Sequence, residues 1–191
     1  MKYTHAYKQG FTIVELLVVI VIIGILATVS IVAYDGVQQR AKNATIINAA
    51  SQSLKAIETY IATTGEFPLR GVSCITTETY CNSSYSNETP LPVNPAFETN
   101  MATVGSLPKN IPVSGARLRG LLYAFDSSVR VDGELRPATL RYYLFGEQQR
   151  CGLPGTVSGA YPDYVLSTTG YTTDERGTGK TKCEITISKT L

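Results

Sequence analysis

The chain has 191 residues, of which 43% are apolar and 17% are charged, and its formal net charge is +2. The apolar share is large enough to build a core, which argues against a wholly disordered chain. His5 is the only histidine, so the chain is a poor candidate for Ser–His–Asp or Cys–His catalysis and for the commonest zinc sites.

The N-terminal region is polar and basic over residues 1–10, through Lys2 and Lys8, and then strongly apolar over residues 11–33. A helix of about 23 residues rises about 34 Å, enough to cross a bilayer core of about 30 Å. A secretory signal peptide fits less well, because its apolar centre spans about 7–15 residues and ends in a small-residue cleavage site. A plain single-pass anchor is the other alternative.

Glu15 is the only ionisable residue between positions 11 and 33. A carboxylate in the bilayer costs roughly 2.5 kcal/mol or more, so it usually has a partner or a function. No cation lies in the same run, but a cut between Gly10 and Phe11 would create an α-amine about one helical turn away. That amine could neutralise Glu15 of its own chain or of a staggered neighbouring copy, which would set the register between copies.

Residues 10–20 read Gly-Phe-Thr-Ile-Val-Glu-Leu-Leu-Val-Val-Ile. This run resembles the class III signal of type IV pilins and type II secretion pseudopilins. The resemblance implies that a prepilin peptidase cuts after Gly10 and methylates Phe11, and that Glu15 is the assembly carboxylate. The similarity extends beyond this run, although Val32 stands where many members of the family carry a proline.

The helical pattern becomes amphipathic after residue 34. Apolar residues recur three or four positions apart at Val37, Ala41, Ala44, Ile47, Ala50, Leu54, Ile57 and Ile61. This spacing predicts one apolar stripe on a helix. Because Gly65 and Pro68 are stop signals, we expect one helix over residues 12–63.

The resemblance divides the chain into three parts. Residues 1–10 are expected to be a prepilin leader, and residues 11–33 the transmembrane or filament-core half of the helix. Residues 34–191 are expected to form a globular head that includes the amphipathic half of the helix. Tyr60 and residues 65–68 also resemble the end of this helix in pilins and pseudopilins.

Residues 65–115 lack periodicity, and their length is unusual for a connection, so we expect local structure or a functional surface there. The part from 66 to 100 is acidic. Asn82 and Asn87 fit the Asn-x-Ser/Thr glycosylation pattern, which arises readily by chance in a loop rich in serine and threonine.

Several runs in the C-terminal half have strand character. They are residues 121–125, 128–131 before an Asp132-Gly133 hairpin signal, 139–145, 164–168 and 183–188. An antiparallel sheet that covers the apolar stripe of the helix is the simplest core. The predicted fold class is therefore α+β and pilin-like, with a long N-terminal helix packed against a C-terminal antiparallel sheet.

The cysteines are Cys74, Cys81, Cys151 and Cys183. None forms a Cys-x-x-Cys pair, and their even number beyond a membrane segment favours disulfides in an oxidising compartment. Pairing neighbours in sequence gives 74–81 and 151–183, an arrangement that resembles the disulfide-bounded C-terminal regions of pilins. Four cysteines allow three connectivities, and the sequence does not choose among them.

Other chemical signals are weak. Gly179-Lys180-Thr181 is like the end of a phosphate-binding loop, but Asp174 stands where that motif needs a glycine, and a strand rather than a helix follows. Asp163, Asp174 and Glu175 could bind calcium but lack EF-hand spacing. We expect no metal and no cofactor.

Residues 109–150 are basic and contain Tyr123, Tyr142 and Tyr143. Such a mixture can bind single-stranded DNA. Removal of Lys2 and Lys8 leaves a mature chain with no net charge, so we do not expect DNA to be a partner. We expect this stretch to meet the acidic region at 66–100 instead, and the tyrosines to lie either in the core or on the surface.

The predicted function is that of a structural pilin without catalytic activity. Its partners would be the prepilin peptidase, copies of itself and other pilins, and indirectly an assembly ATPase and inner-membrane platform proteins. It would lie in the cytoplasmic membrane before assembly and in an extracellular pilus afterwards. The alternatives are a secretion pseudopilin and a membrane-tethered monomeric adhesin or DNA receptor.

Overall fold

The computed structural model describes residues 11–76, 81–82, 90–113, 118–167 and 178–189. The chain divides into two compact units, Met1–Gln38 and Gln39–Leu191. Each unit is described by itself below, although one helix runs through both. Gly10 lies outside the described residues.

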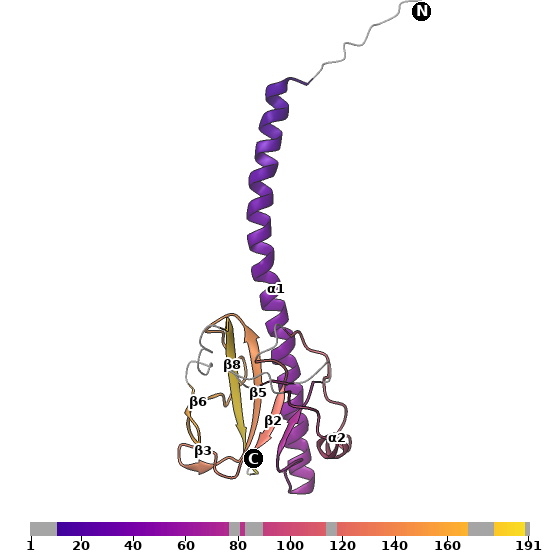
Figure 1. The fold of residues 1–191 in the computed structure, drawn as a ribbon, viewed down its shortest axis with the longest axis vertical. Helices are drawn as coiled ribbons and strands as arrows, with labels where there is room; N and C mark the ends of the chain where they lie inside the picture. Colours follow the sequence, from indigo (N-terminus) through magenta and orange to yellow (C-terminus); the bar gives the residue numbers. More distant parts are fainter. Residues whose placement is uncertain (1–10, 77–80, 83–89, 114–117, 168–177, 190–191) are drawn as a thin grey trace, which may run out of the picture. The chain divides into compact units, whose positions relative to one another are not determined.

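The long helix α1 spans Ile13–Thr64 and is the dominant element in Figure 1. Its bounds lie one residue from those predicted at each end. The helix ends at Gly65, which has a φ of +71° and donates its N–H to the carbonyl of Ile61 at 2.8 Å. A left-handed glycine at this position is a common helix stop.

The N-terminal half of α1 is apolar around its whole circumference. It contains a window with a mean hydropathy of 3.1 of which none is buried, and Ile13 and Val14 are 85% and 70% exposed. By length and composition this part of α1 could cross a membrane. Because an all-round apolar helix is stable only when covered, it needs lipid or other helices around it.

The second half of α1 is covered along the predicted stripe from Ile47 onward and along a different line before it. The side chains that are buried or half-buried along the covered line are Gln39, Asn43, Ile46, Ala50, Ser53, Ile57 and Ile61. The prediction was right for Ala50, Ile57 and Ile61, which are buried, and for Ile47 and Leu54, which are partly buried against the core. It was wrong for Val37, Ala41 and Ala44, which are exposed. Before position 45 the apolar residues lie on the exposed face of α1, and the amides Gln39 and Asn43 lie on its covered face.

The main sheet has strand order β1-β2-β5-β8 and is antiparallel throughout. Its strands are β1 (Val72–Cys74), β2 (Leu122–Phe125), β5 (Ala138–Phe145) and β8 (Lys180–Ile187). Antiparallel pairing of β5 with β8 extends over the full length of both strands. The predicted pilin-like α+β architecture is confirmed.

A smaller sheet has strand order β4-β3-β7-β6. Its strands are β3 (Arg130–Val131), β4 (Glu134–Leu135), β6 (Val157–Ala160) and β7 (Asp163–Leu166). The predicted hairpin at Asp132-Gly133 joins β3 to β4, with positive φ at both turn residues, as a tight hairpin requires.

One hydrophobic core joins α1 to the main sheet. Leu140, Tyr142 and Leu144 of β5 belong to it, together with Cys183, Ile185 and Ile187 of β8, as the alternation in both runs predicted. A short helix α2 (Pro95–Met101) adds Phe97 and Met101. The sequence pattern did not predict α2, β1 or β6.

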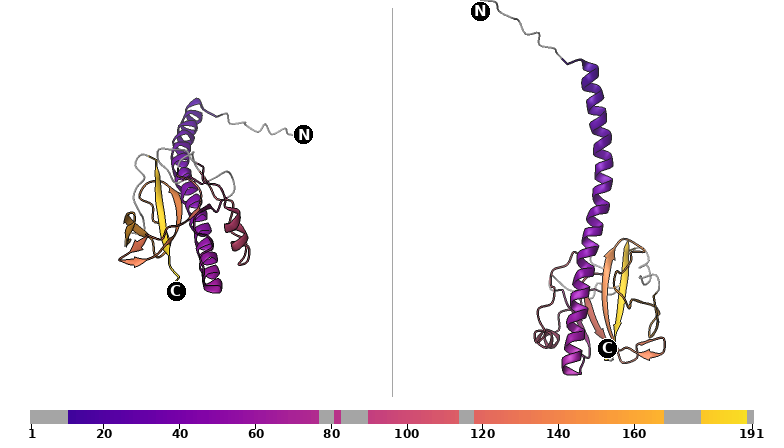
Figure 2. Two further views of the ribbon diagram at one scale, coloured as in Figure 1. Left: turned by 60° about the horizontal axis from the view of Figure 1, so that its bottom comes forward. Right: turned by 180° about the vertical axis from the view of Figure 1, so that it is seen from behind.

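Within the second unit, α2 lies beside α1 on the side away from β3 and β6, as the views from further sides show (Figure 2). The small sheet has its own apolar cluster of Val129, Val131, Val157 and Tyr164. Arg141 on the outer face of β5 interacts electrostatically with Tyr164 of β7, so a polar interaction links the two sheets.

Candidate functional site

The N-terminal end of α1 is closed by Thr12 and Glu15. The Thr12 hydroxyl accepts the backbone N–H of Glu15 at 3.2 Å. In return, the Glu15 carboxylate accepts the Thr12 backbone N–H at 2.9 Å and the Thr12 hydroxyl at 2.8 Å. This is a capping box, in which two side chains satisfy each other's backbone donors. The Thr-x-x-Glu spacing was readable in the sequence, but the sequence analysis did not use it.

The capping box changes the interpretation of Glu15. A cation was expected to be its partner, yet the single chain already supplies two hydrogen-bond donors from Thr12. The carboxylate also lies in the first turn of α1, where the helix dipole favours negative charge. Phe11 is 87% exposed and precedes the helix, and Gly10 lies outside the described residues.

The four cysteines form two disulfides, Cys74–Cys81 and Cys151–Cys183. This is the pairing of sequence neighbours that resembled pilins. Cys151 and Cys183 are fully buried in the core beside α1, so the bridge ties the loop after β5 to β8. Cys74 and Cys81 lie in a small cluster with Leu122 and fasten the chain after β1.

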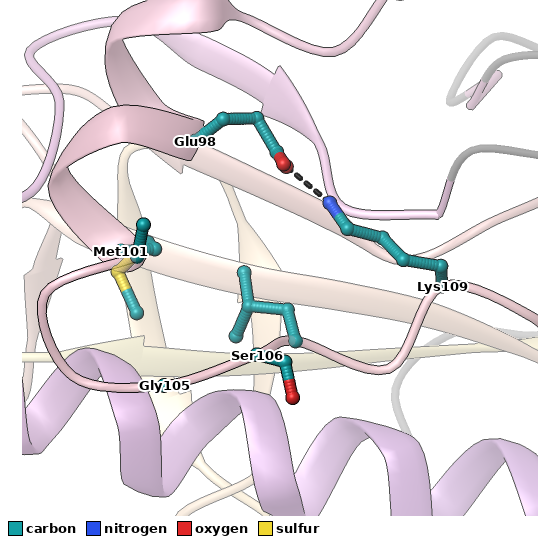
Figure 3. Close-up of a pocket in the computed structure, with 7 residues that line it drawn as sticks. Glu98, Met101, Gly105, Ser106 and Lys109 are labelled. Atoms are coloured by element: carbon teal, nitrogen blue, oxygen red, sulfur yellow. Dashed lines mark hydrogen bonds and ion pairs between the residues drawn. The ribbon is translucent and has the colours of Figure 1, made fainter.

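A pocket of about 200 Å³ lies between α2 and the loop that follows it. Figure 3 shows Glu98 and Lys109 pointing toward one another across it, and the two side chains form an ion pair. The remaining lining includes the apolar Met101 and Leu107. Because its two charged groups neutralise each other, the pocket presents neither an acid–base pair nor a net charge to a ligand.

No cluster of three His, Cys, Asp or Glu side chains suited to a metal ion occurs among the described residues. Of the calcium candidates, Asp163 is exposed on β7, and Asp174 and Glu175 lie outside the described ranges. Lys180 of the phosphate-loop-like run begins β8 and donates to the carbonyl of Leu118 at 3.0 Å. The strand predicted to follow it is confirmed.

The basic stretch at 109–150 meets the acidic region through one described ion pair, between Lys109 and Glu98. Arg136 pairs instead with Glu134, and Arg141 with Glu184. These three bases therefore pair with acids in different elements, rather than facing the acidic region as a group.

Tyr123, Tyr142 and Tyr143 are all buried. Their rings are therefore unavailable to stack on DNA bases. Asn82 is fully buried as well, so the folded head does not present it for glycosylation; Asn87 lies outside the described residues.

Comparison with known proteins finds a short motif near the N-terminus and similarity to pilins. Residues 5–31 match the prokaryotic N-terminal methylation motif. A fimbrial protein of Neisseria meningitidis serogroup A is 36% identical over 69 residues, which are 36% of this chain and 41% of that protein.

Two further relatives show the same pattern. Fimbrial protein EcpC of Eikenella corrodens is 32% identical over 80 residues, 40% of this chain and 52% of that protein. Type IV major pilin protein PilE1 of Neisseria gonorrhoeae is 36% identical over 69 residues, 36% of this chain and 42% of that protein.

The matched stretch spans between two fifths and about half of the length of these curated relatives. No solved structure matches the chain significantly. The resemblance inferred from the run that begins at Gly10 is nevertheless confirmed: this chain carries the prokaryotic N-terminal methylation motif and is similar to type IV pilins.

Proposed function

We propose that this chain is a structural subunit of a type IV pilus-like filament and polymerises through α1. The observation that carries the proposal is that the N-terminal half of α1 is apolar all round and uncovered. This half begins inside the methylation motif at residues 5–31. Lipid would cover this half before assembly and neighbouring copies would cover it afterwards. The chain itself would catalyse no reaction.

Processing is the first step of the proposal. A prepilin peptidase would remove residues 1–10 by cutting after Gly10 and would methylate the new amino group of Phe11. Residues 11–33 would then form the membrane or filament-core segment, and residues 34–191 the head. The exposed, non-helical Phe11 supports this proposal, because a peptidase needs access to the bond before it.

Assembly is the second step. In the separate subunit Thr12 satisfies the Glu15 carboxylate, which lowers the cost of holding that carboxylate in lipid. In the filament the Phe11 amine of an adjacent copy would bind Glu15. Repeated head-to-tail contacts of this kind do not close, so they produce an open helical polymer. An assembly ATPase and membrane platform proteins would supply the work.

The location follows from the same features. The subunit would lie in the cytoplasmic membrane with Lys2 and Lys8 on the cytoplasmic side, and then in a pilus outside the cell. A pseudopilin is the alternative of the same fold, and the fimbrial and pilin names of the relatives above favour a pilin over it.

Processing is tested by mass spectrometry of the protein from a host that has a prepilin peptidase. We expect a mature N-terminus at Phe11 that carries one methyl group. Protein that retains Met1, or that is cut near residue 33, would contradict the proposal.

Assembly is tested with Glu15→Ala, with Ser30→Ala as a matched control. Ser30 is another polar residue in the apolar half of α1, and its hydroxyl bonds only to the carbonyl of Leu26 within the helix, at 2.8 Å. We expect Glu15→Ala to be inserted and cut normally but to give few or no filaments after shearing and electron microscopy. Its neighbour's amine would be left unpaired in an apolar core, at a cost of several kcal/mol.

Ser30→Ala should give normal filaments. Abundant filaments from Glu15→Ala would show that assembly does not depend on this carboxylate. Wild-type protein that functions without forming filaments would favour the membrane-tethered monomer.

A further inference from the structure

Two amide side chains of α1 hold the last residue of β5. The Asn43 side chain accepts the backbone N–H of Phe145 at 2.8 Å and donates to its carbonyl at 2.9 Å. Gln39, one turn earlier, donates to the same carbonyl at 2.7 Å. We call Gln39, Asn43 and Phe145 the amide clasp.

The clasp fills a gap in the main sheet. Strand β2 pairs with β5 only as far as Arg141, whereas β5 continues to Phe145. On that side no strand among the described residues neighbours the backbone of Phe145, and the Asn43 amide supplies the donor and the acceptor that a strand would supply. Unpaired backbone groups are costly where water is excluded, which explains why two amides lie on the covered face of α1.

Two further features reinforce the clasp. The Lys42 ammonium lies 5.4 Å from the centre of the Phe145 ring, within the range of a cation–π contact. Gly146 has a φ of +88°, and a Cβ at this position would clash with the Gln39 amide nitrogen. The turn after β5 is therefore shaped to admit the Gln39 side chain.

The clasp also marks where α1 first contacts the head. Side chains at 34–38 are exposed, and Gln39 is the first that is partly covered. The second compact unit begins at the same residue. The apolar contacts of α1 with the sheet begin only at Ile46.

We propose that the amide clasp is the device that stops α1 from peeling away from the head. When force acts on the N-terminal half of α1, the bonds to Phe145 must break before the contacts at Ile46 are exposed. Such a force would arise in a filament, so this part of the proposal rests on the proposed function. The clasp itself is formed within a single chain. It can therefore be tested without filaments.

The test compares two double variants of the full chain in detergent micelles. Gln39→Ala with Asn43→Ala removes the clasp. Gln38→Ala with Asn48→Ala is the matched control, because it makes the same two replacements at exposed positions of the same helix. Both variants gain equal helix propensity, so any difference between them reports the clasp. Hydrogen–deuterium exchange of the backbone is the measurement.

We expect exchange of α1 amides at residues 43–50 and of the Phe145 N–H to rise about tenfold or more in the clasp variant, and not in the control. The amides around Ile57 and Ile61 should stay protected. Equal exchange in the two variants would overturn the proposal. A uniform rise in exchange along α1 to Ile61 would also overturn the proposal. It would show that the two amides stabilise the whole core, rather than only the part of α1 nearest to the clasp.

A second pair of variants covers the case in which the double variant does not fold. Gly146→Ala brings its Cβ into the Gln39 amide and, less closely, against the Gln149 amide, and it leaves the sequence of α1 intact. Gly133→Ala is its control, because Gly133 has a similar φ of +85° but nothing within 4 Å of an added Cβ. Trypsin cuts after Arg40 and Lys42, which lie beside the clasp. Cleavage at these sites measures the fraction of molecules in which this part of α1 has opened.

We expect faster tryptic cleavage at Arg40 and Lys42 in Gly146→Ala than in Gly133→Ala. Equal cleavage at these two sites in both variants would contradict the role assigned to Gln39.

Discussion

Tyr142 and Tyr143 are adjacent in β5 and point to opposite faces of the main sheet. The Tyr142 hydroxyl donates to the carbonyl of Cys151 at 2.8 Å, in the core beside α1. The Tyr143 hydroxyl is buried without a hydrogen-bond partner among the described residues, and Tyr143 lines a space of about 10 Å³ with Phe145 and Lys180. A space of that size is at the lower limit for one water molecule.

The two tyrosines therefore form a matched pair for mutation. Tyr142→Phe should lower the free energy of unfolding by about 1–3 kcal/mol, because it leaves a buried carbonyl unpaired. Tyr143→Phe should change it by less than about 0.5 kcal/mol or raise it, because no hydrogen bond to a described residue is lost. Urea unfolding of the two variants measures both values. An equal loss in Tyr143→Phe would show that its hydroxyl is bound to an ordered water.

Alkaline pH should unfold the head through its core tyrosines. Burial raises the pKa of Tyr123, Tyr142 and Tyr143 above the ordinary value. A group whose pKa is raised in the folded state contributes stability that is complete below its unfolded pKa of about 10 and is lost as the pH rises through the folded pKa. We therefore expect stability to fall above about pH 10.

Absorbance at 295 nm, followed together with circular dichroism, tests this expectation. The buried tyrosines should ionise only as the ellipticity of the head is lost. Ionisation of every tyrosine near pH 10 with the fold intact would contradict the burial of these three hydroxyls.

At the scale of elements, β8 depends on its connections because it is the last strand of the main sheet. β5 supplies its full-length ladder, and on the outer face the buried Glu184 pairs with Arg141 at 2.6 Å. The Cys151–Cys183 disulfide then anchors the middle of β8 to the loop after β5. A Cβ added at Gly152, beside that bridge, would lie 3.1 Å from Ile47 of α1, so the backbone next to the bridge approaches the helix closely.

The two disulfides should differ in their effect on stability. The Cys151–Cys183 bridge spans a sequence separation of 32 and the Cys74–Cys81 bridge one of 7. In the chain-entropy model the longer loop stabilises by about 3.7 kcal/mol and the shorter by about 2.5 kcal/mol. We expect Cys151→Ala with Cys183→Ala to lower the melting temperature more than Cys74→Ala with Cys81→Ala.

Thermal melting of the two double variants, each with its remaining bridge verified by non-reducing peptide mapping, makes the comparison. A larger loss from the short bridge would show that native packing around Cys74 outweighs loop entropy.

At the scale of the whole molecule, the two units differ in whether they cover their own apolar surface. The head contains its own continuous core, which begins on α1 at Ile46. The N-terminal half of α1 has no cover of its own. A chain that starts at Tyr34 keeps the amide clasp and the core residues and loses only the uncovered part.

Residues 34–191 alone should therefore fold as a soluble domain with a cooperative thermal transition and no titratable thiol. Far-UV circular dichroism and thiol titration under denaturing conditions provide the measurements. A matched chain that starts at Ile47 removes the clasp and Ile46 and should be clearly less stable. Two or more free thiols in the exported longer chain would contradict the disulfide assignment.

Local signals accounted for much of this fold. The C-terminal bound of α1 was predictable because Gly65 and Pro68 are local stop signals. The hairpin at Asp132-Gly133 was predictable for the same reason, since its positive φ values are a property of those residues. In contrast, α2 buries only Phe97 and Met101, which is too few for a periodic signal, and β1 has three residues.

The sequence by itself determined which surfaces must be shielded from water. An uncharged apolar run needs lipid or other helices around it, and an alternating strand needs one covered face. Only the tertiary structure decided which surfaces meet. The predicted apolar stripe included Val37 and Ala41 and left out Gln39 and Asn43. The structure covers the two amides instead, because Phe145, more than 100 positions away, presents a backbone N–H and carbonyl that they satisfy. Periodicity shows only which face of a helix is apolar on average. Which polar side chains that face can bury depends on the backbone groups of a distant strand that they meet, here those of Phe145.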